Sequence, residues 1–300
     1  MNDSVIPALC HPERGQGDPP SRSLPRDPRG SGQPGITPAL AARLSGTPLA
    51  ILLDIDGTLA PIASRPDASV VPAATLDIIS RLARLPNTHV ALVTGRAVAA
   101  ARKLVPLDGL GVIGNHGFEI LGEDGEMIIA PEALSHRDAL RSAVARLAPL
   151  AERHPGVILE DKTWTMSVHT RLAARAQIAE ITAAVTNVAS ELGLTLTRGR
   201  EMLELRPPIQ VHKGTAAVEW AKSVGAIEPG GSVVYVGDDR TDEDAFEALR
   251  AAAPHAAVTI RVGEPDAGET TFAEFGVPSP DQVRDFLEAL VSIRAARRRD

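Results

Sequence analysis

The sequence predicts an α/β fold: a doubly wound, mostly parallel sheet interrupted by an inserted α+β domain. Two observations lead to this prediction. Near both ends of the chain, apolar runs alternate with amphipathic stretches, and the runs are continuous in Val, Ile and Leu, as in parallel strands covered on both faces. Between them, residues 120–207 follow a helix–hairpin–helix–hairpin order, which predicts an antiparallel sheet with two helices on one side.

The core elements are placed by these runs and by helical spacing of apolar residues. Strands are expected at about 49–54, 88–93, 110–114, 232–237 and 256–262. Helices are expected at about 72–85, 96–104, 213–224, 241–252 and 280–295. The core is therefore expected to comprise residues 46–118 and 208–300, with an inserted cap over residues 119–207.

The cap is expected to consist of helices at about 132–153 and 173–192, and strands at about 156–161, 164–169, 194–198 and 202–206. The period-two rule divides its strand residues between two faces. The apolar face should pack on the helices and holds Val157, Leu159, Met166, Val168, Leu203 and Leu205. The other face is polar and holds Glu160, Lys162, Ser167, His169, Glu204 and Arg206. Such a face is either simply solvated or a recognition surface for a polar ligand.

Composition narrows the class of protein. The net charge of −7 argues against a general nucleic-acid binder, which must neutralise phosphates. No apolar run approaches the ~20 residues of a membrane span, so no membrane association is expected. Cys10 is the only cysteine, so no disulfide can form within the chain, and a cytoplasmic location is expected. Residues 1–45 are rich in Pro, Gly, Arg and Ser, which predicts a disordered leader.

Acidic residues follow two of the predicted core strands. Asp54 and Asp56 end the first strand in LLDIDGTL, and Asp238, Asp239 and Asp242 follow the strand SVVYV in GDDRTDED. The carboxyl ends of parallel strands meet at one edge of the sheet, where ligands bind. Carboxylates gathered there repel one another unless a cation lies between them, and Mg²⁺ takes oxygen ligands of this kind. Alone, each motif could be a self-capping turn or an acidic helix start.

Anion-binding residues accompany these carboxylates. Thr94-Gly95-Arg96 follows a strand and opens a helix, where a hydroxyl, backbone amides and a helix N-terminus suit an oxyanion such as phosphate. Lys213 opens another helix and could bring a positive charge to the same anion. A metal site, an anion pocket and a free carboxylate together suit phosphoryl transfer to an aspartate. The second carboxylate would then act as general acid and base.

These motifs carry a family resemblance. DIDGT, TGR, Lys213 and GDD, in this order, resemble the four motifs of the haloacid dehalogenase superfamily of phosphohydrolases. DIDGTLAPI, GNHGFE, GREMLELRP and GDDRTDEDAF more narrowly resemble the trehalose-6-phosphate phosphatases. The resemblance covers residues from about 48 to 262. It implies a haloacid dehalogenase-like core with a cap that recognises the substrate.

The resemblance also implies residue roles. Asp54 would be the nucleophile and a Mg²⁺ ligand, and Asp56 the general acid and base, also offering its backbone carbonyl to the metal. Thr94 and Lys213 would hold the transferring phosphoryl group. The remaining implied metal ligands are Asp238, with Asp239 and Asp242 nearby. The implied substrate-binding residues are Arg96, Asn115, His116, Glu119, Glu160, Lys162, Arg200 and Glu204.

The leading hypothesis is a Mg²⁺-dependent phosphatase that releases trehalose and phosphate from trehalose 6-phosphate. A second is a phosphatase of the same fold that acts on another sugar phosphate, such as sucrose phosphate or glucosylglycerol phosphate. A third, from a different class, is a non-catalytic module that binds a sugar phosphate in the same cleft. Binding alone does not need a paired nucleophile and acid, so Asp54 and Asp56 favour an enzyme.

Overall fold

A computed structural model describes residues 22–23, 36–63, 65–199, 201–265 and 270–296. Within these residues, the larger sheet runs in the order β1-β13-β12-β11-β2-β3-β4-β5-β6, and it is parallel up to β4 and antiparallel from β4 to β6. Its strands are β1 (Arg22–Ser23), β2 (Leu49–Leu53), β3 (Thr88–Val93), β4 (Gly111–Gly114), β5 (Glu119–Leu121), β6 (Met127–Ile129), β11 (Ser232–Gly237), β12 (Ala257–Val262) and β13 (Phe275–Val277). The predicted α/β class is confirmed.

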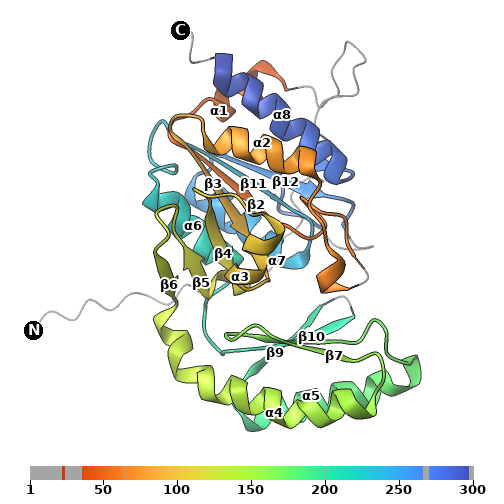
Figure 1. Ribbon diagram of the computed structural model, residues 1–300. Helices are drawn as coiled ribbons and strands as arrows, with labels where there is room; N and C mark the ends of the chain where they lie inside the picture. The colour runs from red at the N-terminus through yellow and green to blue at the C-terminus, as the bar shows by residue number, and fades with distance from the viewer. Residues whose placement is uncertain (1–21, 24–35, 64, 200, 266–269, 297–300) are drawn as a thin grey trace, which may run out of the picture.

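Helices cover both faces of the larger sheet. Along β2, Ile51 packs into one apolar cluster and Leu52 into the other, because alternate side chains point to opposite faces. The first cluster takes residues from α1 (Pro38–Leu44), α2 (Ala73–Ala83), α3 (Val98–Leu104) and α8 (Pro280–Ala296). The second takes residues from α6 (Lys213–Ser223) and α7 (Arg240–Ala252). In Figure 1, α2 and α8 lie together on one side of the sheet.

The predicted core strands and helices agree with the observed elements to within two residues at each end. The agreement follows from the continuous apolar runs, since all residues of β2 and β11 are buried. Among the described helices, none has the length and apolar character needed to cross a membrane.

Three segments differ from the expectation. Residues 22–23, expected in the disordered leader, form β1, which pairs with β13. Residues 119–129, expected in the cap, form the β5–β6 hairpin that extends the larger sheet from β4. The hairpin turns at Gly125, whose φ of 86° is readily adopted by glycine. Residues 38–44, expected in the disordered leader, form α1, with Leu40 and Leu44 buried. Residues 1–21 and 24–35 of the expected leader lie outside the described residues.

The cap, residues 131–207, forms a second layer. Its described strands pair in the antiparallel order β7-β8-β10-β9, and two helices lie on the side away from the core (Figure 1). The strands are β7 (Ile158–Asp161), β8 (Met166–His169), β9 (Thr195–Gly199) and β10 (Met202–Arg206). The helices are α4 (Arg137–Arg153) and α5 (Ile178–Glu191), entered through the 3₁₀ turns η3 (Pro131–His136) and η4 (Arg175–Gln177).

The predicted division of the cap strands into two faces is confirmed. Val157, Met166 and Leu205 are buried against α4 and α5, with Leu159 partly buried beside them. The polar face is turned to the carboxyl edge of the larger sheet (Figure 1). The 3₁₀ turn η2 (Asn115–Gly117), after β4, lies at this junction and reaches buried groups of the cap.

Candidate active site

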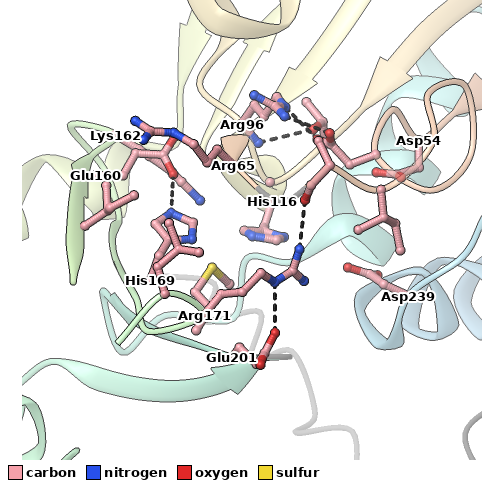
Figure 2. A pocket seen from close by; sticks show the side chains of 18 of the residues that line it. Asp54, Arg65, Arg96, His116, Glu160, Lys162, His169, Arg171, Glu201 and Asp239 are labelled. Atoms are coloured by element: carbon pink, nitrogen blue, oxygen red, sulfur yellow. Dashed lines mark hydrogen bonds and ion pairs between the residues drawn. The ribbon is translucent and has the colours of Figure 1, made fainter. Parts of the chain in front are cut away.

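A cavity of about 240 Å³ lies between the core and the polar face of the cap (Figure 2). Sequence-predicted residues from both layers line it: Asp54, Asp56, Thr94, Arg96, His116, Glu160, Lys162, Lys213 and Asp239. The structure therefore brings motifs that are far apart in the chain to a single site. Residues without a predicted role also line it, among them Ile62, Arg65, Leu172, Glu201 and Met202.

Asp54 follows β2 and is only 4% exposed. Its backbone N–H donates to Val236 O at 3.0 Å, which continues the pairing of β2 with β11 and fixes the position of the carboxylate. Lys213 Nζ donates to Asp54 Oδ1 at 2.9 Å. Burial raises the pKa of Asp54 well above its ordinary value, with Lys213 opposing the shift and Asp242 and Asp238 reinforcing it. The site thus carries more negative charge than Lys213 alone offsets.

Asp242 organises the acidic loop after β11. Its Oδ1 accepts from Lys213 Nζ at 2.8 Å and from the Tyr235 hydroxyl at 2.7 Å. Its Oδ2 accepts from the backbone N–H groups of Asp238 and Asp239 at 2.9 and 3.0 Å. A carboxylate has about four acceptor positions, so these donors occupy the whole of Asp242. These bonds hold Lys213 and the loop in place beside the acidic cluster.

Asp239 caps α7. Its Oδ1 accepts from the backbone N–H and the hydroxyl of Thr241 at 2.8 and 2.7 Å, and from Asp242 N–H at 3.1 Å. These bonds satisfy helix N-terminal donors that would otherwise lack partners. The side chain is half exposed and lines the cavity. Asp239 is therefore at the site, with one oxygen committed to the helix.

The acidic cluster fits a hard cation. Asp54, Asp238 and Asp242 have carboxylate oxygens within 4.8 Å of one another. Since the hydrogen bonds of Asp242 occupy both of its oxygens, Asp54 and Asp238 are the carboxylates with capacity to ligate. Burial, followed by repulsion from Asp242 and Asp239, raises the pKa of Asp238 to about 7. A side chain at Gly57 would collide with Asp238, since its Cβ would lie 2.1 Å from Oδ2, so this glycine permits the close approach.

Asp56 is held by two side chains. Arg96 donates from Nε to Oδ2 at 2.5 Å and from Nη2 to Oδ1 at 2.7 Å. Ser69 Oγ donates to Oδ1 at 2.8 Å. Arg96 was expected to contact substrate; it lines the cavity, but its guanidinium is engaged with Asp56. Thr94, 1% exposed, also lines the cavity, and its Oγ1 accepts from Arg96 N–H at 3.2 Å.

The cap supplies a polar wall. The Glu160 carboxylate and the His169 ring lie 2.9 Å apart, and both line the cavity. Burial opposes ionisation of Glu160, yet the hydrogen bond from His169 and the charge of Lys162 lower its pKa. Arg171 reaches the core: its Nη1 donates to Ala63 O at 2.8 Å, and its Nε donates to Glu201 Oε2 at 2.8 Å (Figure 2). The cap is therefore tied to the core loop that follows Asp56.

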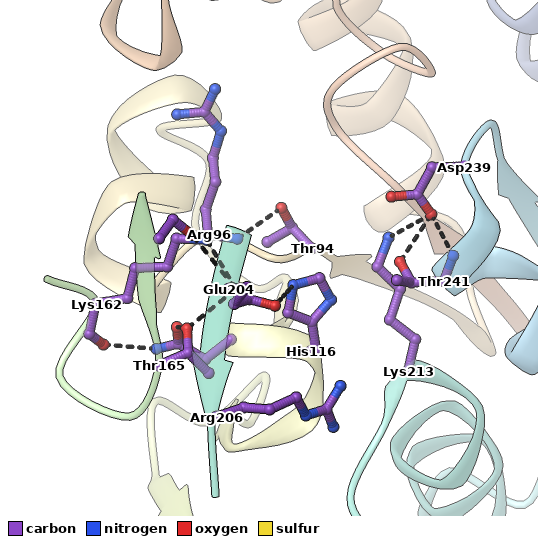
Figure 3. A network of polar contacts seen from close by, with 12 residues as sticks. Thr94, Arg96, His116, Lys162, Thr165, Glu204, Arg206, Lys213, Asp239 and Thr241 are labelled. Atoms are coloured by element: carbon purple, nitrogen blue, oxygen red, sulfur yellow. Dashed lines mark hydrogen bonds and ion pairs between the residues drawn. The ribbon is translucent and has the colours of Figure 1, made fainter. Parts of the chain in front are cut away.

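A buried network joins cap and core behind this wall (Figure 3). Glu204 Oε1 accepts from Lys162 Nζ and from Thr165 Oγ1, both at 3.2 Å, and its Oε2 lies 3.3 Å from His116 Nε2. Although burial opposes it, the charges of His116 and Lys162 hold the pKa of Glu204 well below its usual range. Asn115 Nδ2 donates to Lys162 O at 2.9 Å.

Three residues expected to bind substrate lie elsewhere. Asn115 and Glu204 belong to the buried network and do not line the cavity. The Glu119 carboxylate accepts from Val98 N–H at 2.7 Å, so it satisfies the first turn of α3, and burial raises its pKa. Arg200 lies outside the described residues. Ser69, which contacts Asp56, was missed because a serine in a loop gives no sequence signal.

Comparison with known proteins identifies the family. The family model described as trehalose-phosphatase matches residues 52–276. A trehalose-phosphate phosphatase from Mycobacterium avium is 37% identical over 254 residues, covering 82% of this chain and 63% of the relative. An uncharacterized glycosyl hydrolase from Mycobacterium tuberculosis is 33% identical over 293 residues, covering 96% of this chain and 21% of the relative. The chain thus spans less than two thirds of the length of these curated relatives.

Solved structures show the same fold. A crystal structure of a trehalose-6-phosphate phosphatase related protein superposes with a TM-score of 0.72 at 27% identity, covering 83% of this chain and 99% of that one. The C-terminal domain of a Candida albicans trehalose-6-phosphate phosphatase superposes with a TM-score of 0.64 at 21% identity, covering 85% of this chain and 95% of that one. At that identity the second likeness concerns the fold alone.

Proposed function

The chain belongs to the trehalose-phosphatase family, and we propose that it is a Mg²⁺-dependent phosphatase that hydrolyses trehalose 6-phosphate to trehalose and phosphate. One observation carries the proposal. The residues suited to phosphoryl transfer, Asp54, Thr94 and Lys213, line the same cavity as the polar wall of the cap. A phosphate held at the core edge would therefore present its sugar to hydrogen-bonding side chains.

In the first half-reaction, Asp54 attacks the phosphorus. Lys213 occupies Asp54 Oδ1, which leaves Oδ2 as the attacking oxygen. The bond from phosphorus to the sugar oxygen breaks as the bond to Asp54 forms, giving an aspartyl phosphate. Asp56 donates a proton to the departing sugar oxygen, since an alkoxide is a poor leaving group. Thr94 and Lys213 donate hydrogen bonds to the phosphoryl oxygens and stabilise their charge.

In the second half-reaction, water attacks the phosphorus of the aspartyl phosphate. Asp56, now ionised, accepts the proton of this water, and the bond from phosphorus to Asp54 breaks. Phosphate leaves and the Asp54 carboxylate is restored. One group thus serves as acid and then as base, which two successive proton transfers of opposite direction require.

Asp54 and Asp238 would hold Mg²⁺, because their oxygens have ligating capacity and Lys213 offsets only part of the repulsion among the carboxylates. The ion would supply charge neutralisation for the phosphoryl group. Glu160, His169 and Lys162 line the cavity on the side of the cap, and this supports a role for them in hydrogen bonding to sugar hydroxyls.

Phosphate release tests the proposal across trehalose 6-phosphate, sucrose 6-phosphate, glucose 6-phosphate and glucosylglycerol phosphate, with Mg²⁺ and with EDTA. We expect metal-dependent turnover that strongly favours trehalose 6-phosphate. Asp54→Asn should lower turnover by on the order of 10⁴-fold or more, as loss of a nucleophile does. Asp108→Asn, at a fully exposed carboxylate, is the matched control and should change nothing.

The outcomes separate the hypotheses. A preference for another sugar phosphate would leave the proposed roles of Asp54 and Asp56 unchanged, and that sugar phosphate would replace trehalose 6-phosphate as the proposed substrate. Turnover by Asp54→Asn at the wild-type rate would refute the mechanism. Absence of phosphate release from every member of the panel would refute the hypothesis of an enzyme and leave the hypothesis of a non-catalytic module that binds a sugar phosphate.

A further inference from the structure

We propose that Arg96 and Ser69 are positioning residues for the general acid, and that Arg96 acts through the Asp56 carboxylate rather than by gripping the substrate. The inference rests on the proposed phosphatase activity. It gives Arg96 a role different from the one its place in the TGR motif suggests. It also brings into the reaction a serine that no sequence motif marks.

The contacts around Asp56 define a fixed orientation. The guanidinium of Arg96 meets both carboxylate oxygens, at 2.5 and 2.7 Å, and Ser69 Oγ meets Oδ1 at 2.8 Å. Oδ1 thus accepts from two side chains, whereas Oδ2 accepts from Arg96 alone. An oxygen has room for about two donors, so Oδ2 is the one with capacity to exchange a proton with substrate or water.

The two residues that contact the Asp56 carboxylate, Ser69 and Arg96, are themselves held in place. Ser69 is 3% exposed, and the Arg96 side chain is 13% exposed. The backbone of Arg96 is also held, since its N–H donates to Thr94 Oγ1 and its carbonyl accepts from Asn115 N–H at 2.7 Å. A two-pronged contact fixes the plane of a carboxylate, which a single ammonium cannot do. Arg96→Lys therefore keeps the charge and removes the orientation.

General acid catalysis matters most for poor leaving groups. A nitrophenolate leaves readily without a proton, whereas a phenolate, and still more a sugar alkoxide, needs one. A displaced Asp56 should therefore slow the first half-reaction in proportion to the basicity of the leaving group. A residue that binds the phosphoryl group instead should affect all phosphate esters alike.

The experiment measures kcat/KM for a series of substituted phenyl phosphates and for trehalose 6-phosphate. The aryl series contains no sugar, so contacts to sugar hydroxyls cannot contribute to its slope. In wild type we expect kcat/KM to depend only weakly on the basicity of the leaving group. Arg96→Lys and Ser69→Ala should steepen this dependence, leaving p-nitrophenyl phosphate nearly unchanged and slowing phenyl phosphate and trehalose 6-phosphate by on the order of tenfold or more.

Matched controls are Arg102→Lys on α3 and Ser135→Ala in η3, both partly or fully exposed and away from the cavity, and both should keep the wild-type slope. Ser69→Ala carries the test should Arg96→Lys unfold, as judged by its melting temperature. A steeper slope in the variants supports the proposal. Three results would overturn the proposal but not the phosphatase activity. They are an equal drop in kcat/KM for all aryl phosphates, a raised KM for trehalose 6-phosphate alone, and no change in kcat/KM for any substrate. Absence of wild-type turnover overturns the proposed function and the inference together.

Discussion

At the scale of single residues, opposite charges pair around the cavity, and the buried pairs carry the largest energetic consequences. Lys213 forms ion pairs with Asp54 and Asp242, and Lys162 forms an ion pair with Glu204. Removing one partner of such a pair leaves an uncompensated buried charge, which costs more than the pair itself contributes. Variants of these residues therefore need a measurement of stability beside any measurement of activity.

Glu204→Gln should lower the free energy of unfolding by roughly 3 kcal/mol near neutral pH, because Lys162 would lose its buried carboxylate partner. The folded-state pKa of Glu204 is depressed, so its stabilisation is present above the unfolded-state pKa and is lost as the pH falls. The difference in melting temperature should thus be full above about pH 5 and shrink below about pH 4. Glu152→Gln, on an exposed face of α4, is the control. A difference independent of pH would contradict the pairing.

Asp238→Asn should reduce the stabilisation that Mg²⁺ confers. Binding to the folded state alone stabilises wild type by about 2.7 kcal/mol at a hundredfold excess over Kd. Loss of one of two available carboxylates weakens the site, so the rise in melting temperature with Mg²⁺ should fall in the variant. Asp108→Asn should respond as wild type does. A rise in melting temperature in Asp238→Asn equal to that of wild type would mean that the cation binds at another site.

The convergence of the core motifs on one cavity could be predicted, but not every residue that lines the cavity, nor how the residues pair. Asp54, Thr94 and Lys213 each lie just after a strand or at a helix start, and that position sends them to the same edge. Which side chains pair depends on differences of a few tenths of an ångström in their relative positions across the fold. The engagement of Asp56 by Arg96 and of Glu204 by His116 therefore required the structure.

At the scale of elements, long buried strands were predictable and short edge elements were not. The β5–β6 hairpin has three residues in each strand, so its apolar runs are too short to identify a strand from the sequence. Its turn, Asp124-Gly125, was the available clue, since this dipeptide favours tight hairpins. The seven-residue helix α1 begins at Pro38 with Thr37 as its cap, and the Pro-rich composition before it hid the signal.

Helix α1 should contribute substantially to stability. Leu44 is fully buried and belongs to the same apolar cluster as β2 and α8. Leu44→Ala should cost about 2–5 kcal/mol through lost burial and a residual cavity. Leu134→Ala, at a side chain that is 57% exposed, should cost no more than about 0.5 kcal/mol. Denaturant unfolding measures both, and a neutral Leu44→Ala would mean that α1 does not pack on the sheet in solution.

At the scale of the whole molecule, the cavity has one wall from each layer. The polar face of the cap strands could be predicted from residue parity, but its placement over the core could not. That placement depends on contacts such as Arg171 to Ala63 and Asn115 to Lys162, which join segments 108 and 47 residues apart. A substrate in this cavity would therefore contact both layers at once.

The cap should close further on the core when substrate binds, to exclude water from the aspartyl phosphate. Ile62 of the core and Leu172 of the cap line the cavity while 56% and 51% exposed, and closure would bury such apolar side chains. Solution scattering should show a smaller radius of gyration with Mg²⁺, orthovanadate and trehalose together than with trehalose alone. An unchanged curve would contradict closure.

The central claim is that Asp54 carries the phosphoryl group between the two half-reactions, and a trapped intermediate tests it most directly. Asp56→Asn lacks the base for the second half-reaction, whereas p-nitrophenyl phosphate needs no acid in the first. We predict a burst of one nitrophenolate per enzyme with Mg²⁺, followed by slow turnover, and a phosphoryl group found by mass spectrometry on the peptide that contains Asp54. Nitrophenolate and phosphate released together, with that peptide unmodified throughout, would contradict the account.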